Sequence, residues 1–340
     1  MKIEIFKKIS IFVLIMGFSC AGFAQQQAQF TQYMFNKLSY NPGYAGSSGS
    51  ICASALYRNQ WMGLTLTSSG GDIAEGSTPQ NILFSFDMPV NFLHGGIGLS
   101  VFTNKIGFYN FFNFNIDYAY RFFTSKGSFA IGLEASLANG TLDYSNLVGY
   151  DDLTGDSGNP ISQQHSDQLL TADKEQSEMV FDISAGLYYT EPGRLFLGLS
   201  GKNLLGTQSS TLNYQNARSI YLFGGYDYIL YDQSFHLQPS VLVKTADFST
   251  FQIDLTCLLE YQNTVWFGLN YRLQDAISIL GGVNWKNLKI GLAYDMTTSK
   301  LGTYKSGRSS GTLEIFAKYC FKITPKKPIP SSYINTLYFR

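Results

Sequence analysis

The sequence predicts an all-β fold, a transmembrane antiparallel β-barrel of about fourteen strands. Three observations predict it. Apolar and polar residues alternate along many short segments, the links between these segments tend to alternate between long and short, and only 14% of the residues are charged whereas 16% are aromatic. A mean hydropathy of −0.03 with so little charge requires fine-scale mixing of apolar and polar residues. The aromatic content excludes low-complexity disorder, and beyond the N-terminus no apolar run is long enough for a membrane-spanning helix.

Residues 1–24 have the order of a secretory signal peptide. Lysines at positions 2, 7 and 8 precede an apolar run from Ile9 to Phe18, and small residues follow. We place the cleavage site after Ala24. The alternative is a lipoprotein acylated on Cys20, but Gly17 stands where such a site usually has an aliphatic residue. The chain is therefore expected to be exported.

Strands are predicted wherever the alternation has a period of two. The clearest one runs from Phe112 to Phe122, with Phe, Ile and Tyr on one face and Asn, Asp, Ala and Arg on the other. The segment around Ile220 is ambiguous because both of its faces carry apolar residues. The predicted strands are, in order, Ala53–Trp61, Ile82–Met88, Ile97–Thr103, Phe112–Phe122, Phe129–Ala138, Val180–Tyr189, Leu195–Lys202, Ile220–Tyr228, Phe235–Lys244, Phe251–Tyr261, Val265–Leu273, Ile277–Lys286, Leu288–Thr297 and Leu313–Phe321.

The links separate into two kinds. After the even-numbered strands they are short, and after the ninth and eleventh strands they are short as well. The longer links are at 62–79, 104–110, 140–178, 204–216 and 298–311. Long loops on one side and tight turns on the other are typical of a bacterial outer-membrane barrel. Because the predicted number of strands is even, both termini are expected in the periplasm.

The polar faces of the strands are expected to line the barrel lumen, because a charge facing lipid is costly. Mixed signs favour internal ion pairing and hydration over the alternative, a selective conduit, which tends to favour one sign. The candidate lumen charges are Arg58, Asp117, Arg121, Glu134, Lys244, Asp254, Arg272, Asp295 and Glu314.

The cysteines define no disulfide framework. Removal of the signal peptide leaves Cys52, Cys257 and Cys320, an odd number, so at most one bridge can form within the chain. A bridge between Cys257 and Cys320 is not expected, because the first is predicted to face outward and the second inward.

Little in the sequence predicts catalysis, a metal or a cofactor. The three histidines have no zinc-site spacing, and no nucleophile elbow or phosphate loop is present. We therefore predict a non-enzymatic protein. Asp151 and Asp152 begin an acidic stretch of the link 140–179, and this stretch does not match an EF-hand. We interpret it as a solvated loop and as the best candidate for an external contact, with calcium binding as the alternative. The 24 basic and 24 acidic residues cancel and predict no nucleic acid.

Three blocks early in the chain resemble the PorP/SprF family of Bacteroidetes type IX secretion. They are Gln29–Asn36 (QFTQYMFN), Asn41–Gly46 (NPGYAG) and Tyr57–Trp61 (YRNQW), the last similar to the family's Arg-x-Gln-Trp. Further similar segments include Gly98–Gly107, Tyr118–Arg121, Gln238–Ser240, Trp266–Arg272 and Ile290–Asp295, so the resemblance covers most of the mature chain. The departures are Gly43 in place of Ala, Asn104 in place of Asp, and a longer stretch from Met62 to Ser77.

The resemblance implies an outer-membrane barrel that helps to secrete or anchor large surface proteins, such as gliding adhesins with a C-terminal targeting domain, or that docks periplasmic machine components. The expected partners are outer-membrane lipid, type IX secretion components and the secreted client. The candidate docking residues are Asn41, Pro42, Tyr44, Trp61, Asp151 and Asp152. The alternative function is a channel or transporter for small solutes with the N-terminal segment as its gate, and a weaker one is an outer-membrane hydrolase.

The predicted organisation has four parts. They are the signal peptide 1–24, a segment 25–50 that is a lead-in, a lumen plug or a periplasmic docking element, the barrel 51–322, and a tail 323–340 that is a periplasmic extension or a plug.

Overall fold

The structure is a computed structural model, and it describes residues 29–62, 67–68, 71–72, 78–107, 109–143, 175–209, 216–230, 234–299 and 311–321. The predicted signal peptide, the acidic loop residues Asp151 and Asp152 and the C-terminal tail lie outside the described residues. Within the described part of the chain, no helix has the length and apolarity needed to cross a membrane.

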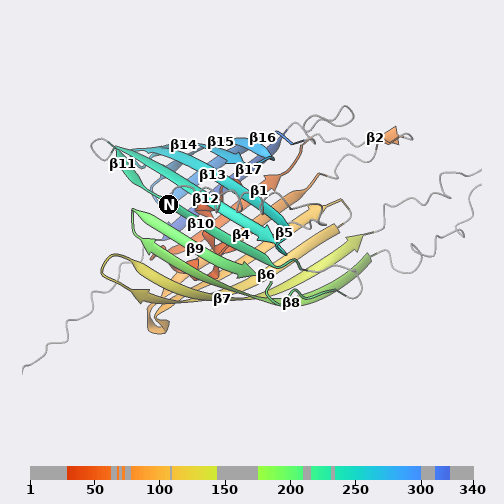
Figure 1. Cartoon of the computed structure of the whole chain (residues 1–340), viewed down its shortest axis with the longest axis horizontal. Helices are drawn as coiled ribbons and strands as arrows, with labels where there is room; N and C mark the ends of the chain where they lie inside the picture. The colour runs from red at the N-terminus through yellow and green to blue at the C-terminus, as the bar shows by residue number, and fades with distance from the viewer. Residues whose placement is uncertain are drawn as a thin grey trace, which may run out of the picture.

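Fourteen antiparallel strands form a closed barrel, as the sequence predicted (Figure 1). Neighbours in sequence pair with one another, β1 pairs with β17, and the pairing of β10 with β12 completes the ring. The strands are β1 (Ile51–Asn59), β4 (Gln80–Val90), β5 (Gly95–Ile106), β6 (Tyr109–Phe123), β7 (Ser128–Asp143), β8 (Glu175–Glu191), β9 (Leu195–Lys202), β10 (Ser219–Tyr226), β12 (Phe235–Ala246), β13 (Thr250–Tyr261), β14 (Val265–Arg272), β15 (Ala276–Trp285), β16 (Leu288–Thr297) and β17 (Thr312–Phe321).

Three short elements complete the β-structure. The strand β11 (Tyr228–Leu230) extends the pairing along β12, and β2 (Thr67–Ser68) pairs with β3 (Gly71–Asp72) in a small separate hairpin. The 3-10 turn η4 (Asn91–Leu93) lies between β4 and β5.

The two faces of the strands have the exposure expected for a barrel in lipid. On β6 the Ile116 side chain is 50% exposed, whereas that of its neighbour Asp117 is fully buried. Apolar side chains thus face outward and polar ones inward, the reverse of a soluble barrel. Large aromatic side chains are exposed at the turns as well, at Phe92, Phe123, Phe248 and Trp285, where the interfacial girdles of membrane barrels lie.

The links confirm the predicted asymmetry with one correction. The links 60–79, 144–174, 203–218 and 298–311 all lie at the end where β1 finishes, which we call the long-link end. The opposite, short-turn end has tight turns such as the one at Gln262 and Asn263, which both have a φ of 50°. The link expected at 104–110 is not long, because β5 continues to Ile106 and β6 starts at Tyr109.

Residues Phe30–Gly46, which we call the plug, lie inside the barrel. The plug contains three 3-10 turns, η1 (Tyr33–Phe35), η2 (Lys37–Ser39) and η3 (Pro42–Tyr44). It begins at the long-link end, where Gln29 lines a cavity with Trp61. It finishes near the short-turn end, where Gly46 lies against the backbone of Met88 and Gly96. The described part of this segment therefore runs through the lumen from one end of the barrel to the other.

The path of the plug separates the first and last described residues. The described chain starts at Gln29 at the long-link end, whereas β17 finishes at the short-turn end. The even number of strands places the start of β1 and the end of β17 together, but the segment before β1 returns through the lumen. The termini themselves lie outside the described residues, so their periplasmic location remains a prediction.

Aromatic side chains of the plug pack against the inner wall. Tyr40 meets Tyr221 of β10 edge-to-face with 5.3 Å between ring centroids, and Tyr44 meets Tyr188 of β8 at 5.5 Å. Tyr221 and Phe223 are both buried on the inner face of β10. The two apolar faces of this strand, ambiguous in the sequence, therefore face lipid on one side and the plug on the other.

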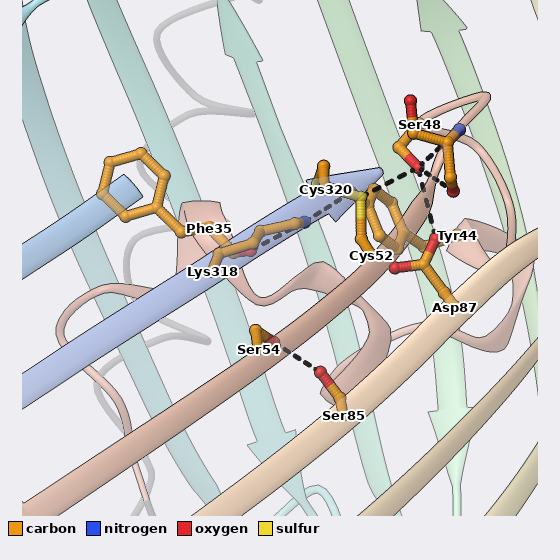
Figure 2. The surroundings of a disulfide bond; sticks show 10 residues. Phe35, Tyr44, Ser48, Cys52, Ser54, Ser85, Asp87, Lys318 and Cys320 are labelled. Carbon is orange, nitrogen blue, oxygen red and sulfur yellow. Dashed lines mark hydrogen bonds between the residues drawn. A yellow bond between two sulfur atoms is a disulfide. The ribbon is translucent and has the colours of Figure 1, made fainter. Parts of the chain in front are cut away.

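A disulfide joins Cys52 of β1 to Cys320 of β17 (Figure 2). The two residues are register partners in the pair of strands that joins the ends of the barrel. The sequence did not identify this pair, because the first strand was predicted to start at Ala53 and thus left Cys52 outside it. Cys257 is free and exposed on the outer face.

The disulfide predicts the thiol count of the processed chain. Denatured without reductant, each chain should react with one equivalent of maleimide, at Cys257, and after reduction with three. A Cys257→Ser variant is the matched control. It should react with no maleimide before reduction and with two equivalents after reduction. Three reactive thiols in unreduced wild-type protein would contradict the pairing.

Candidate functional site

The start of the plug is held by a buried group of charges near the long-link end. The Glu314 carboxylate accepts hydrogen bonds from the backbone N–H groups of Thr31 (2.9 Å) and Gln32 (2.8 Å). The Thr31 hydroxyl donates to the Asp295 carboxylate at 2.8 Å. All four residues are fully buried or nearly so.

Two arginines of the wall complete this group. Arg58 of β1 pairs with Asp295 (2.8 Å) and Glu314 (3.0 Å), and its Nη1 also donates to the Thr31 hydroxyl at 3.1 Å. Arg272 of β14 pairs with Asp254 of β13 at 3.0 Å and donates to the same hydroxyl at 3.3 Å. We call Arg58, Asp254, Arg272, Asp295 and Glu314 the plug seat. Buried charges of this kind are tolerated only when each has opposite charges and hydrogen bonds around it.

The middle of the plug approaches the wall closely at glycines. A Cβ on Gly132 of β7 would lie 2.2 Å from the backbone nitrogen of Gly43, and one on Gly186 of β8 would lie 2.1 Å from Oδ1 of Asn41. Asn41 caps η3 by accepting from the Gly43 N–H at 2.8 Å, and its side-chain amide donates to the Leu187 carbonyl at 2.8 Å. Glycine at these wall positions therefore leaves room for the NPGYAG turn.

The end of the plug is held at the short-turn end. Arg121 of β6 donates to the carbonyls of Ala45 (2.9 Å) and Gly46 (3.3 Å). Lys318 of β17 donates to the Tyr44 hydroxyl at 3.2 Å and to the Phe35 carbonyl at 3.5 Å. Figure 2 shows Lys318, Tyr44 and Phe35 beside the disulfide, so this part of the plug is held next to the joined ends of the barrel.

The remaining predicted lumen charges also lie on the inner wall. Glu134 of β7 forms a buried ion pair with Lys202 of β9. Asp117 of β6 is the register partner of Glu134. Lys244 of β12 lines a small cavity together with Tyr221. The structure thus brings five of the nine predicted charges into the plug seat and places the other four elsewhere along the lumen.

The candidate docking residues do not gather on one surface. Three of them belong to η3 and its N-cap and are buried in the lumen, where they pack against the wall: Asn41, Pro42 and Tyr44. Trp61 lies at the long-link end with a φ of 55°, and its N–H donates to the Thr312 hydroxyl at 3.1 Å. Asp151 and Asp152 lie outside the described residues.

Sequence reasoning missed Thr31, Gln32 and Lys318 as contact residues between plug and wall. The first two belong to the FTQY block, which was identified only through its resemblance. Lys318 donates to a tyrosine hydroxyl and a backbone carbonyl that are both distant in sequence, and the sequence pattern marks neither partner. One signal in the sequence could have indicated a filled lumen: an apolar residue on the inner face, such as Phe316. In a lumen filled with water, an inward apolar side chain would not be stabilised by packing.

Two cavities remain beside the plug at the ends of the barrel. One of about 520 Å³ lies at the long-link end and is lined by Gln29, Trp61, Asn81 and Gln274, among others. The other, about 280 Å³, lies at the short-turn end. In the described ranges no three His, Cys, Asp or Glu side chains come together as metal ligands.

A fourteen-stranded barrel with an apolar outer face and a lumen filled by its own N-terminal segment defines a plugged outer-membrane barrel. The sequence model described as type IX secretion system membrane protein PorP/SprF matches residues 22–319. The chain belongs to this family, and its location is the outer membrane. The family is one of secretion-system membrane components.

The chain is similar, at low identity, to several solved structures. They include the outer membrane protein Omp33 of Acinetobacter baumannii (7% identity, 80% of this chain and 99% of that chain, TM-score 0.41) and the P. putida toluene transporter TodX (10%, 83% and 92%, TM-score 0.44). A third is BamA from Haemophilus ducreyi lacking POTRA domains 1–3 (10%, 79% and 70%, TM-score 0.40). No curated protein matches the chain.

The plug seat predicts the effect of Glu314→Gln. This change removes the charge that faces Arg58 and weakens the hydrogen bonds to the plug backbone, and breaking a buried pair costs about 3–5 kcal/mol. Trypsin cleavage after Lys37, detected as a new N-terminus at Leu38, should become at least about tenfold faster in folded protein.

The matched control is Glu191→Gln, which breaks an ion pair with the exposed Arg194 at the rim and should leave the cleavage rate unchanged. Equal cleavage rates in the Glu314→Gln variant and the wild type would show that the plug seat does not hold the plug.

Proposed function

We propose that the protein is a non-enzymatic outer-membrane component of type IX secretion that assists the secretion or surface anchoring of large adhesin-like proteins, or docks periplasmic parts of the machine. Family membership supports the association with secretion. The observation that carries the proposal is the plug, which occupies the lumen from the long-link end to the short-turn end. A barrel filled in this way offers its two end surfaces to partners.

The alternative function, a channel for small solutes, has less support. Most of the predicted lumen charges contact the plug or one another, and aromatic side chains fill the space between plug and wall. A conduit needs a continuous hydrated path, for which these contacts leave little room. A large, reproducible conductance from pure wild-type protein in planar bilayers would favour the channel.

The hydrolase alternative requires an activated serine that is hydrogen-bonded to a histidine. Among the described residues, the ring of His236 is hydrogen-bonded through Nδ1 to Oδ1 of Asp227 at 3.0 Å, and no serine hydroxyl is hydrogen-bonded to it. His94, at the turn between β4 and β5, instead stacks near the ring of Tyr120.

The long-link end is the surface we propose for the secreted client. Outer-membrane barrels carry their longer loops outside the cell. The Trp61 ring lies at this mouth beside the larger cavity, and the positive φ of a bulky residue is a costly conformation that the surrounding contacts must hold. Asn41, Pro42 and Tyr44 would act on a partner only through the position of the plug.

Trp61→Ala tests this surface. In cells that lack the wild-type gene, the variant should restore several-fold less client protein on the surface than wild type does, at equal amounts of folded barrel. The loss is expected because truncation of a large aromatic anchor removes much of the contact energy of an interface. Client on intact cells is measured by antibody labelling relative to total client.

The control variant is Phe248→Ala, which removes an exposed aromatic side chain at the same end. It should restore wild-type display. Full client display with Trp61→Ala would exclude this residue as a docking residue, and full display without the barrel would overturn the proposed function.

A further inference from the structure

The cavity at the short-turn end lies between the plug and the wall. It measures about 280 Å³ and is lined by Phe35 and Lys37 of the plug, by Arg194 and Phe196 from the turn and start of β9, and by Asp227 and Lys289. The lining thus includes three basic side chains, Lys37, Arg194 and Lys289, and two acidic ones, Asp227 and Glu191. The basic groups therefore outnumber the acidic ones at this end of the barrel, opposite the long links.

All but one of these charged side chains have a hydrogen-bonded or ionic partner. The pairs are Arg194 with Glu191 at 3.5 Å, Asp227 with His236 at 3.0 Å, and Lys289 with Glu260 at 3.5 Å. The exception is Lys37, for which no carboxylate of the described residues lies within ion-pair distance.

The surroundings of Lys37 compensate its charge only in part. Its Nζ lies 3.4 Å from the centroid of the Phe196 ring, a cation–π contact worth about 0.5–2 kcal/mol. Burial and, to a smaller extent, the positive charges of Lys318 and Lys289 together lower the pKa of Lys37 to about 7. A neutral side chain at position 37 would avoid this cost, so the stability of the plug gives no reason for a lysine here.

We propose that this cavity binds an anionic oxygen group, a carboxylate or a phosphate, which enters from the short-turn end and pairs with Lys37. An anion next to the ammonium group supplies the opposite charge that the fold itself does not. The cavity has room for one group of several heavy atoms, so the ligand is the end of a chain or a headgroup. This inference does not depend on the proposed function.

The experiment uses the full processed chain in nanodiscs of neutral lipid, with lysine labelled by ¹³C at Cε. Titrations use sodium N-acetylglycinate for a protein carboxylate and sodium glycerol 3-phosphate for a lipid headgroup, at constant ionic strength. Lys37→Gln identifies the Lys37 signal, and Lys37→Arg serves if the first variant does not fold. Lys126, exposed at a turn of the same end, is the internal control.

The Lys37 signal should shift and saturate with at least one probe, whereas the Lys126 signal changes little. In Lys37→Gln the affinity, followed at the Lys289 signal, should fall at least about tenfold, because one partner of a partly buried charge pair is removed. Tighter binding of N-acetylglycinate indicates a protein carboxylate, and tighter binding of glycerol 3-phosphate a lipid phosphate. Saturation with neither probe, or equal non-saturating shifts at Lys37 and Lys126, would overturn the proposal.

Discussion

The bonds from the plug backbone to the Glu314 carboxylate are the interaction on which the rest of the lumen depends. One buried carboxylate accepts two backbone N–H groups and pairs with Arg58, and Thr31 links the same group to Asp295 and Arg272. In an interior of low dielectric, neither the charges nor the plug backbone would be satisfied alone. The wall and the plug therefore stabilise each other.

Other features of the wall follow from this contact. A barrel of this many strands encloses more space than its own side chains fill, so a chain segment or water must occupy the rest. Inward aromatic residues such as Tyr188 and Tyr221 pack against the plug, and glycine at 132 and 186 lets its backbone approach. The FTQY and NPGYAG blocks thus belong to the plug, and the RNQW block belongs to the wall, where Arg58 contacts Thr31 of FTQY.

The strands could be predicted from the sequence because lipid on one face and the lumen on the other impose a period of two. Two of them, Leu195–Lys202 and Leu288–Thr297, have the predicted bounds. The path of the plug could not be predicted, because its short 3-10 turns leave no periodic pattern and its partners are distant in sequence. The plug seat could be predicted only in part. The alternation predicts which charged side chains point inward, but it does not predict that Arg58 pairs with Glu314. The pairing of Cys52 could have been predicted if the first strand had been started one residue earlier, since a closed barrel pairs its first and last strands.

Hydrogen exchange of the plug in wild-type protein in a lipid nanodisc tests the account most directly. The amides of Thr31 and Gln32, which donate to Glu314, should exchange as slowly as those in the middle of β6 and β7. Exchange as fast as in the exposed turn at Ser125 and Lys126 would contradict it, because a plug that opens freely can neither hydrogen-bond the buried carboxylates nor close the barrel.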